Sequence, residues 1–238
     1  MRILPFILGS AALLAAPLLA SAQAPRRHFD AQGRAFYRGP LRLTAGGGVA
    51  LYNGDLTTSP TQSRPGACVQ AGVIYPWRPH WAVGAELGWF QLGSYDQLRE
   101  RNLAFRSRNL ALSSYLRFEP LTDPGQYSIT GANAATVKPF LQAGVGLLLY
   151  NPKAYTGTEP LSQQAILDPE RDDYPATGLT LPVGGGLSFL LARGLYLTAQ
   201  GTYVFTSTDH LDDISRRANP LRNDGYGLAE LKLEYTLR

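Results

Sequence analysis

Apolar and polar residues alternate along eight separate stretches of this chain. The last stretch, 228–238, reads LAELKLEYTLR, with apolar residues on one parity and Glu230, Lys232 and Glu234 on the other. The same pattern recurs at 41–52, 68–75, 81–93, 110–118, 140–150, 179–191 and 195–205. A period of two predicts a strand with one apolar and one polar face. The chain is therefore predicted to be all-β, with eight strands.

The lengths of the strands and of their connections favour a barrel that crosses a membrane. The stretches are 8 to 13 residues long, and a tilted transmembrane strand needs about 9–11. The connections 76–79 and 192–194 are short, whereas 53–66, 94–109, 151–178 and 206–226 are long. Outer-membrane barrels have short periplasmic turns and long outer loops. This pattern predicts an eight-stranded antiparallel up-and-down barrel with both termini in the periplasm, although connection 120–138 is longer than this rule expects.

A soluble eight-stranded barrel, such as a lipocalin, is the alternative, and it would place the apolar parity inside. Three features favour the transmembrane barrel. Trp77, Trp81 and Tyr235 lie near strand ends, as an interfacial girdle requires, and many glycines share the polar parity, where a narrow lumen has little room. The polar parity also carries charges of both signs, which we expect to form a lumen network: Arg42, Glu86, Arg117, Glu119, Glu230, Lys232 and Glu234. Arg42 is expected on the strand beside 230–234, because the first and last strands of a closed barrel are neighbours.

The beginning of the chain has the pattern of a secretory signal peptide. Arg2 precedes an apolar stretch, and Ala20-Ser21-Ala22 fits the small residues read at a cleavage site. We therefore predict a signal peptide at 1–22, a periplasmic segment at 23–40 and an outer-membrane barrel at 41–238. The single cysteine, Cys68, excludes an internal disulfide and is expected to be a small lumen residue. The net charge of +4 is spread among strands and loops, which argues against a nucleic-acid partner.

Four loop stretches resemble a known family when they are taken together and in order. They are LYNGDL (51–56), RNLAFRSRNL (101–110), YNPKA (150–154) and TDHLDDIS (208–215). This arrangement resembles the small outer-membrane barrels of Bacteroidota related to PorG, a component of type IX secretion. The likeness covers almost the whole mature chain, and the positions that carry it are Tyr52, Asn53, Gly54, Asp55, Arg101, Asn102, Phe105, Asn151, Pro152, Lys153, Leu211, Asp212 and Asp213. One departure is that the chain ends on Arg238, whereas such barrels usually end on an aromatic residue.

The resemblance implies a non-enzymatic structural or anchoring role near the secretion and gliding machinery, with periplasmic secretion proteins as partners. Two alternatives stay open: a general surface barrel for envelope stability or adhesion, and an enzyme that modifies lipid A. Catalysis needs a nucleophile, a base and an orienting group within reach. Of the three histidines, His28, His80 and His210, only His210 has serines nearby in a surface loop, Ser207 and Ser215. We expect no catalytic centre and no cofactor, and eight strands enclose too little space for a pore.

Two groups of charged loop residues suggest ligands. An acidic group could gather a divalent cation such as Ca²⁺, although solvated carboxylates paired with arginines explain it more simply, and we predict no metal site. Its members are Glu170, Asp172, Asp173, Asp209, Asp212 and Asp213. A basic group could meet the phosphates of lipopolysaccharide, and its members are Arg99, Arg101, Arg106 and Arg108. Outer-membrane lipid is accordingly an expected partner.

Overall fold

The computed structural model describes two compact units, 1–38 and 39–238. The residues described are 27–29, 35–37, 39–54, 64–95, 103–121, 135–157, 166–169, 171–208, 211, 213 and 224–237. The first unit contains a small antiparallel sheet of β1 (Arg27–Phe29) and β2 (Ala35–Tyr37), which the sequence pattern did not predict. The predicted signal peptide, 1–22, lies outside the described residues.

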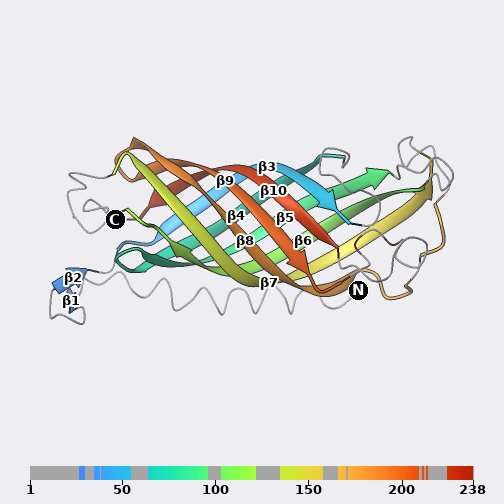
Figure 1. Ribbon diagram of the computed structural model, residues 1–238, viewed down its shortest axis with the longest axis horizontal. Helices are drawn as coiled ribbons and strands as arrows, with labels where there is room; N and C mark the ends of the chain where they lie inside the picture. Colours follow the sequence, from blue (N-terminus) through green and yellow to red (C-terminus); the bar gives the residue numbers. More distant parts are fainter. Residues whose placement is uncertain are drawn as a thin grey trace. The chain divides into compact units, whose positions relative to one another are not determined.

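The second unit is a closed barrel of eight strands, so the predicted fold class is confirmed (Figure 1). Each strand pairs antiparallel with the next along the chain, and β10 closes the barrel against β3, where Thr236 pairs with Arg42. The strands are β3 (Arg42–Asn53), β4 (Gly66–Arg78), β5 (Trp81–Tyr95), β6 (Leu103–Phe118), β7 (Val137–Thr156), β8 (Ala176–Ala192), β9 (Leu195–Thr206) and β10 (Gly225–Thr236).

The barrel has two different ends. One end, here called the turn end, holds the Pro79–His80 and Arg193–Gly194 turns and the last described residue, Leu237. His80 and Gly194 have φ angles of 69° and 80°, which the tight reversals require. The other end, here called the loop end, receives the connections that follow β3, β5, β7 and β9. Figure 1 shows the turn end beside the label C.

Two strands, β6 and β7, continue seven and six residues further toward the loop end than the alternation predicted. β6 begins at Leu103 rather than at 110, and β7 ends at Thr156 rather than at 150, so both segments are strands and not loops. Along these extensions the pattern is inverted: Phe105 is buried inside, whereas Arg106 and Lys153 are exposed outside. An apolar interior with a charged exterior is what a strand shows when water surrounds it. The prediction was wrong here because it sought lipid-facing apolar residues.

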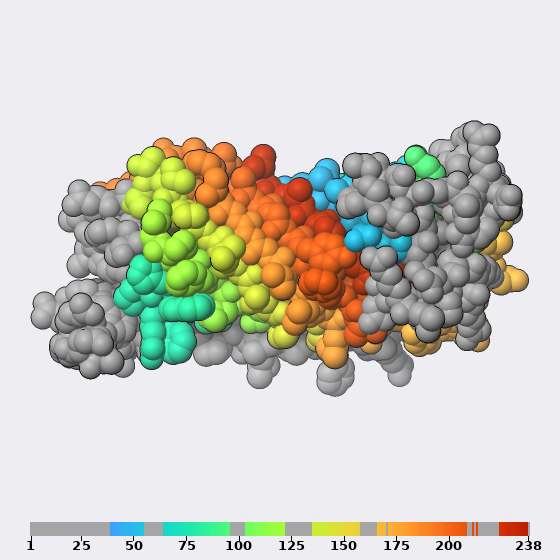
Figure 2. Space-filling model, viewed as in Figure 1, coloured from blue at the N-terminus to red at the C-terminus, as the bar shows by residue number. Residues whose placement is uncertain are grey.

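The outward face of the barrel is an apolar belt. Val145 and Leu141 are 65% and 64% exposed. Other exposed members are Leu43, Val49, Val69, Val83, Leu87, Leu110, Leu112, Leu116, Leu147, Leu179, Leu181, Val183, Leu187, Leu231 and Leu233. In Figure 2 the strands from β7 to β10 form one continuous surface along the barrel. Water would not favour so much contiguous apolar surface on a monomer.

Aromatic residues border the belt at both ends. Trp77, Trp81 and Tyr235 are exposed toward the turn end, and Trp89 and Phe205 are exposed toward the loop end. Trp81 and Trp89 are eight residues apart on β5, which is about 27 Å along a strand and about 20 Å across a membrane at a tilt of about 40°. That height is close to the apolar band of about 25 Å that outer-membrane barrels show. The chain is therefore a transmembrane barrel of the outer-membrane type.

The inward glycines make room for long lumen side chains. Tyr115 pairs with Gly84 on one side and with Gly144 on the other. A Cβ atom at Gly84 would overlap the ring of Tyr115, and one at Gly144 would overlap the backbone of β6. Gly46 is likewise paired with Lys232 and leaves space for its stem. No helix in the described part of the chain is long and apolar enough to cross a membrane.

Candidate functional site

The seven charges that the sequence assigned to the lumen all lie inside the barrel and are at most 5% exposed. Toward the turn end, Arg42 donates to both carboxylate oxygens of Glu119, with Nη1–Oε1 and Nη2–Oε2 distances of 2.7 and 3.2 Å. Arg117 donates from Nη1 to Glu234 Oε1 at 2.8 Å. Glu234 Oε2 also lies 3.7 Å from Nη1 of Arg42. Two arginines and two carboxylates therefore form one cluster that joins β3, β6 and β10.

A second cluster surrounds Lys232 in the middle of the lumen. Its Nζ donates to Glu86 Oε1 and Oε2, at 2.9 and 3.0 Å, and to Gln70 Oε1 at 2.8 Å. Glu230 Oε2 lies 3.4 Å from the same Nζ. The hydroxyl of Tyr115 donates to Glu86 Oε1 at 3.2 Å. The cation thus lies among two carboxylates, and these contacts connect β4, β5, β6 and β10.

The remaining lumen contacts close the space between these clusters and the wall. The guanidinium of Arg117 lies 3.7 Å from the centre of the Phe140 ring, and Lys138 Nζ lies 3.9 Å from that of Tyr196. Cations above aromatic faces are attracted by the ring quadrupole. Thr198 adds a hydrogen bond to Glu234 Oε1 at 2.8 Å. The described charges of the lumen are therefore paired across the barrel, whose eight strands leave room for little more than side chains.

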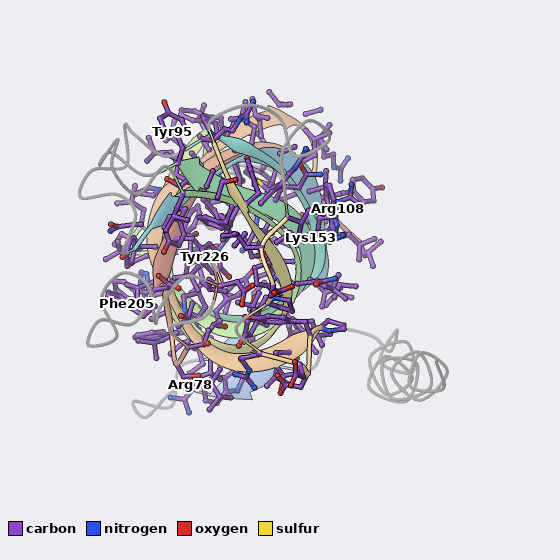
Figure 3. The ribbon with its side chains drawn as sticks, turned by 90° about the vertical axis from the view of Figure 1, so that its right-hand side faces the viewer. Arg78, Tyr95, Arg108, Lys153, Phe205 and Tyr226 are labelled. Carbon is purple, nitrogen blue, oxygen red and sulfur yellow. The ribbon has the colours of Figure 1, made fainter. Side chains whose placement is uncertain are left out.

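An apolar and aromatic cluster fills the half of the lumen nearer the loop end; we call it the loop-end cluster. Its members are Ala50, Tyr52, Cys68, Phe90, Leu92, Phe105, Leu148, Tyr150, Ala154, Ala176, Val204, Leu211, Tyr226 and Leu228. Tyr52 and Phe105 meet edge to face with ring centres 4.7 Å apart, and Phe90 and Tyr226 stack at 4.7 Å. Figure 3 shows Tyr226 within the ring of strands. The pattern of alternation did not predict this cluster, because its aromatic residues belong to the polar parity.

The loop-end cluster brings together residues from all four family-like stretches, with Tyr150 and Ala154 from the third. Tyr52, Phe105 and Leu211 all belong to it. Asp224 connects two of them, since it accepts a hydrogen bond from the Tyr52 hydroxyl on Oδ1 at 2.5 Å and one from the Leu211 N–H on Oδ2 at 3.0 Å. No pattern in the sequence indicated Asp224, which belongs to none of the stretches. Asn53 Nδ2 donates to the hydroxyl of Tyr203 at 3.1 Å.

The other family-like positions are distributed as follows. Gly54 is buried and forms an isolated bridge, and Pro152 faces inward on β7 between the exposed Asn151 and Lys153. Asp213 is buried and accepts a hydrogen bond from the hydroxyl of Tyr174 at 2.8 Å. Burial and this hydrogen bond raise the pKa of Tyr174 well above its ordinary value. The predicted positions Asp55, Arg101, Asn102 and Asp212 lie outside the described residues.

The acidic loop group is only partly described. Asp172 and Asp173 are exposed, and Asp173 pairs with Arg171 with a 2.6 Å Oδ2–Nη2 distance. This hydrogen bond raises the pKa of Arg171 above its ordinary value. Glu170, Asp209 and Asp212 lie outside the described residues. Among the side chains that the structure describes, no group of three or more His, Cys, Asp and Glu is arranged to hold a metal ion.

The catalytic hypothesis falls largely on residues that the structure does not describe, including His210 and Ser215. Ser207 is described, and its hydroxyl accepts a hydrogen bond from the Leu179 N–H at 3.0 Å. His80 lies in a turn at the opposite end, where its Nδ1 is 2.8 Å from the carbonyl oxygen of Glu119. Cys68 is buried, with its Sγ 4.0 Å from Glu230 Oε1. His80 and Ser207 therefore lie at opposite ends of the barrel and cannot act together.

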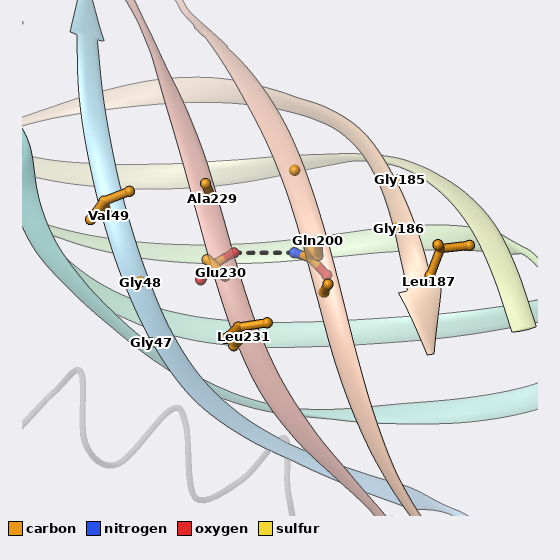
Figure 4. Close-up of a pocket in the computed structure, with 12 residues that line it drawn as sticks. Gly47, Gly48, Val49, Gly185, Gly186, Leu187, Gln200, Ala229, Glu230 and Leu231 are labelled. Carbon is orange, nitrogen blue, oxygen red and sulfur yellow. Dashed lines mark hydrogen bonds between the residues drawn. The ribbon is translucent and has the colours of Figure 1, made fainter. Parts of the chain in front are cut away.

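A shallow groove crosses the outward face of β3, β10, β9 and β8 (Figure 4). Its floor is made of small residues, Gly47, Ala229, Ala199, Gly201 and Gly185, and Val49, Leu187 and Leu231 stand at its sides. A hydrogen bond beneath this floor, from Gln200 Nε2 to Glu230 Oε2 at 3.2 Å, belongs to the lumen. The groove is part of the apolar belt, so its surface is open to lipid.

The chain is similar in fold to solved outer-membrane proteins. Neisserial surface protein A is 14% identical, with a TM-score of 0.47 over 83% of this chain and 97% of that one. Ail, the attachment invasion locus protein of Yersinia pestis, is 12% identical, with a TM-score of 0.45 over 84% and 99%. The outer membrane enzyme PagL is 15% identical, with a TM-score of 0.38 over 82% and 99%. No protein-family model matches the chain, and no characterised protein matches it in sequence.

Proposed function

We propose that this outer-membrane barrel is a non-enzymatic anchor for a larger assembly of the cell envelope, and that the assembly is of the type IX secretion and gliding kind. The observation that supports an anchor is the lumen, in which Arg42, Glu119, Arg117 and Glu234 bridge the strands. Contacts that bridge the strands give rigidity, and eight strands enclose little more space than side chains need. The choice of the type IX assembly rests on the resemblance of the four loop stretches to the PorG-related family.

The proposal includes an orientation in the membrane. Short turns face the periplasm and long loops face outward in barrels of this type, so the turn end and both termini would lie in the periplasm. The signal peptide at 1–22 would direct export to that compartment. Periplasmic secretion proteins would then bind at the turn end, where Pro79, His80, Arg193 and Gly194 form the two described turns.

The test is deletion of the gene from an organism that has the type IX system, followed by complementation. An anchor predicts that cargo export or gliding is impaired, that wild type restores it, and that His210→Ala restores it equally. A variant that fails to form the barrel should not restore it. If lipid A acylation changes while export stays normal, the protein is an enzyme and the anchor proposal is wrong. If neither changes, the protein is a general surface barrel.

A further inference from the structure

Four cations gather on the outward face near the loop end, and we call them the loop-end basic patch: Arg64, Arg106, Arg108 and Lys153. All four are exposed. The β-sheet register places them in two rows. One row runs from Gly93 through Arg106 to Lys153, and the next row, nearer the belt, runs from Gln91 through Arg108 to Asn151.

Arg64 extends the first row on its other side. Its N–H donates to the carbonyl oxygen of Gly93 at 3.0 Å. If Gly93 carried a Cβ atom, that atom would lie 3.9 Å from the Cβ of Arg64. Because Gly93 has no side chain, no side chain separates Arg64 from Arg106 in this row. Neighbouring strands lie about 4.8 Å apart. Three cations therefore share a row about 15 Å wide. Figure 3 shows two of the four, Arg108 and Lys153, together on the outside of the barrel.

The two rows bring like charges close together. Arg106 and Lys153 are direct cross-strand partners, and like charges directly opposite one another destabilise a sheet. Arg106 donates to a neutral group, Gln91 Oε1, at 2.8 Å. Of the described neighbours, Gly93, Tyr95 and Asn151 carry no carboxylate. Asp168 is exposed, and it continues the antiparallel pairing of Ile166 with Tyr155 toward Lys153, so one carboxylate lies on the far side of Lys153 from Arg106. A phosphate oxygen between Arg106 and Lys153 would accept hydrogen bonds from both and remove their repulsion.

The height of the patch identifies the source of the anion. The row nearest to it on the belt side is Trp89, Leu110 and Leu149, the upper edge of the apolar belt. Arg108 is two residues above Leu110, about 7 Å along the strand, and Arg106 is two residues further. The headgroup layer on each side of a bilayer is about 5–8 Å thick. At a strand tilt of about 40°, Arg108 is thus about 5 Å above Leu110, within the headgroup layer, and Arg106 is about 10 Å above it, at the outer edge of that layer. Acyl chains would lie against Leu110 and Leu149.

We propose that the loop-end basic patch binds the phosphate-bearing headgroup of an outer-leaflet lipid, with the acyl chains of that lipid on the adjoining belt. Arg108 contacts the phosphate nearest to the belt. Arg106, Lys153 and Arg64 bind a second phosphate, which lies further from the membrane. The inference requires the barrel to lie in a membrane, but it does not require a secretion assembly. Failure of one proposal would therefore leave the other standing.

The experiment is native mass spectrometry of the full mature chain, refolded in detergent and offered lipid A with both phosphates or lipid A without them. Wild type should retain the phosphorylated lipid, and Arg106→Gln with Lys153→Gln should bind it on the order of tenfold more weakly. Arg106→Lys with Lys153→Arg keeps both charges and should retain most of the binding. The control is Arg78→Gln with Arg193→Gln, which removes two exposed cations at the turn end and should not weaken it.

Each other outcome overturns the proposal. Equal binding of phosphorylated and phosphate-free lipid A would mean that the apolar belt alone holds the lipid. Equal loss in the control variant would mean that net charge matters and the position of the patch does not. Displacement of the lipid by millimolar inorganic phosphate would identify the patch as a site for soluble anions. A heat-dependent shift in electrophoretic mobility, measured for each variant, establishes that it has folded before it is compared.

Discussion

Arg117 and Glu234 lie on strands on opposite sides of the barrel, and their side chains meet across the lumen with Nη1 and Oε1 2.8 Å apart. Both side chains are 1% exposed. Removal of one partner from a buried ion pair costs about 3–5 kcal/mol, because the remaining charge stays buried without compensation. The pair therefore stabilises the contact between β6 and β10 only when both charged side chains are present.

The first prediction is that Glu234→Gln lowers the free energy of unfolding by about 3–5 kcal/mol. The neutral amide leaves Arg117 without its carboxylate and also removes the second carboxylate near Arg42. Urea unfolding in detergent, followed by tryptophan fluorescence, measures the change. Asp172→Asn makes the same change of charge at an exposed site and should shift stability by less than about 0.5 kcal/mol. Equal effects of the two variants would show that the lumen pair contributes nothing.

The second prediction concerns Gly84, whose missing Cβ leaves room for the ring of Tyr115. Gly84→Ala should destabilise the barrel by about 1–3 kcal/mol, because extra volume in a packed interior forces its neighbours to move. Gly201→Ala is the matched control. Gly201 is on the outward face, and a Cβ there would meet no atom within 4 Å. The same unfolding measurement should show no loss for the control, and a loss equal to that of Gly84→Ala would contradict the inward assignment.

The alternation of the sequence was sufficient to predict the barrel and the direction of its side chains. Each of the eight predicted stretches corresponds to a strand, and the seven lumen charges point inward. A period of two determines which residues share a face, and charges of both signs on one face require partners inside. Arg42 also lies on β3, the strand beside β10, as closure requires, and it pairs there with Thr236. Its shorter contact is with Glu119, directly after β6, rather than with Glu234 on β10.

The loop-end half could not be predicted in the same way. Above the belt the outside of the strands is polar and their inside is apolar, so the lipid-based pattern no longer applies to Phe105 or Lys153. Asp224 connects Tyr52 with Leu211, although it is 172 residues from Tyr52 and 13 residues from Leu211 along the sequence. Contacts at such separation depend on the register of the closed sheet, which single-strand patterns do not contain.

The third prediction distinguishes a membrane belt from a soluble barrel with exposed leucines. Val145 is 65% exposed and pairs with Ser114, which pairs with Ala85, halfway between Trp81 and Trp89 on β5. Val145→Arg should cost about 2–4 kcal/mol in a bilayer, because arginine is then at the midplane. A soluble barrel would tolerate it, since an exposed side chain in water changes stability little.

The measurement for Val145→Arg is the midpoint of chemical unfolding in lipid vesicles. Tyr95→Arg is the control, because Tyr95 is exposed at the loop end of β5, above the belt, where an arginine costs about 0–1 kcal/mol. If Val145→Arg and Tyr95→Arg unfold at the same denaturant concentration, the outward face does not contact hydrocarbon. That result would also remove the basis for the lipid site above the belt.

The last prediction concerns Asp224, which holds two family-like positions together. Tyr52→Phe removes the hydroxyl that donates to Asp224 Oδ1 but keeps the ring against Phe105. A hydrogen bond to a charged group contributes about 1.5–3 kcal/mol, so the hydrogen bond from the Leu211 N–H to Asp224 Oδ2 should open more often. Hydrogen exchange of the Leu211 amide should therefore become roughly tenfold faster or more. Exchange of the Lys232 amide, in the middle of the barrel, should stay unchanged, and Tyr95→Phe, which alters an exposed tyrosine at the same end, should affect neither amide. Faster exchange at both amides would mean that Tyr52 stabilises the whole barrel rather than the position of the loop that contains Leu211.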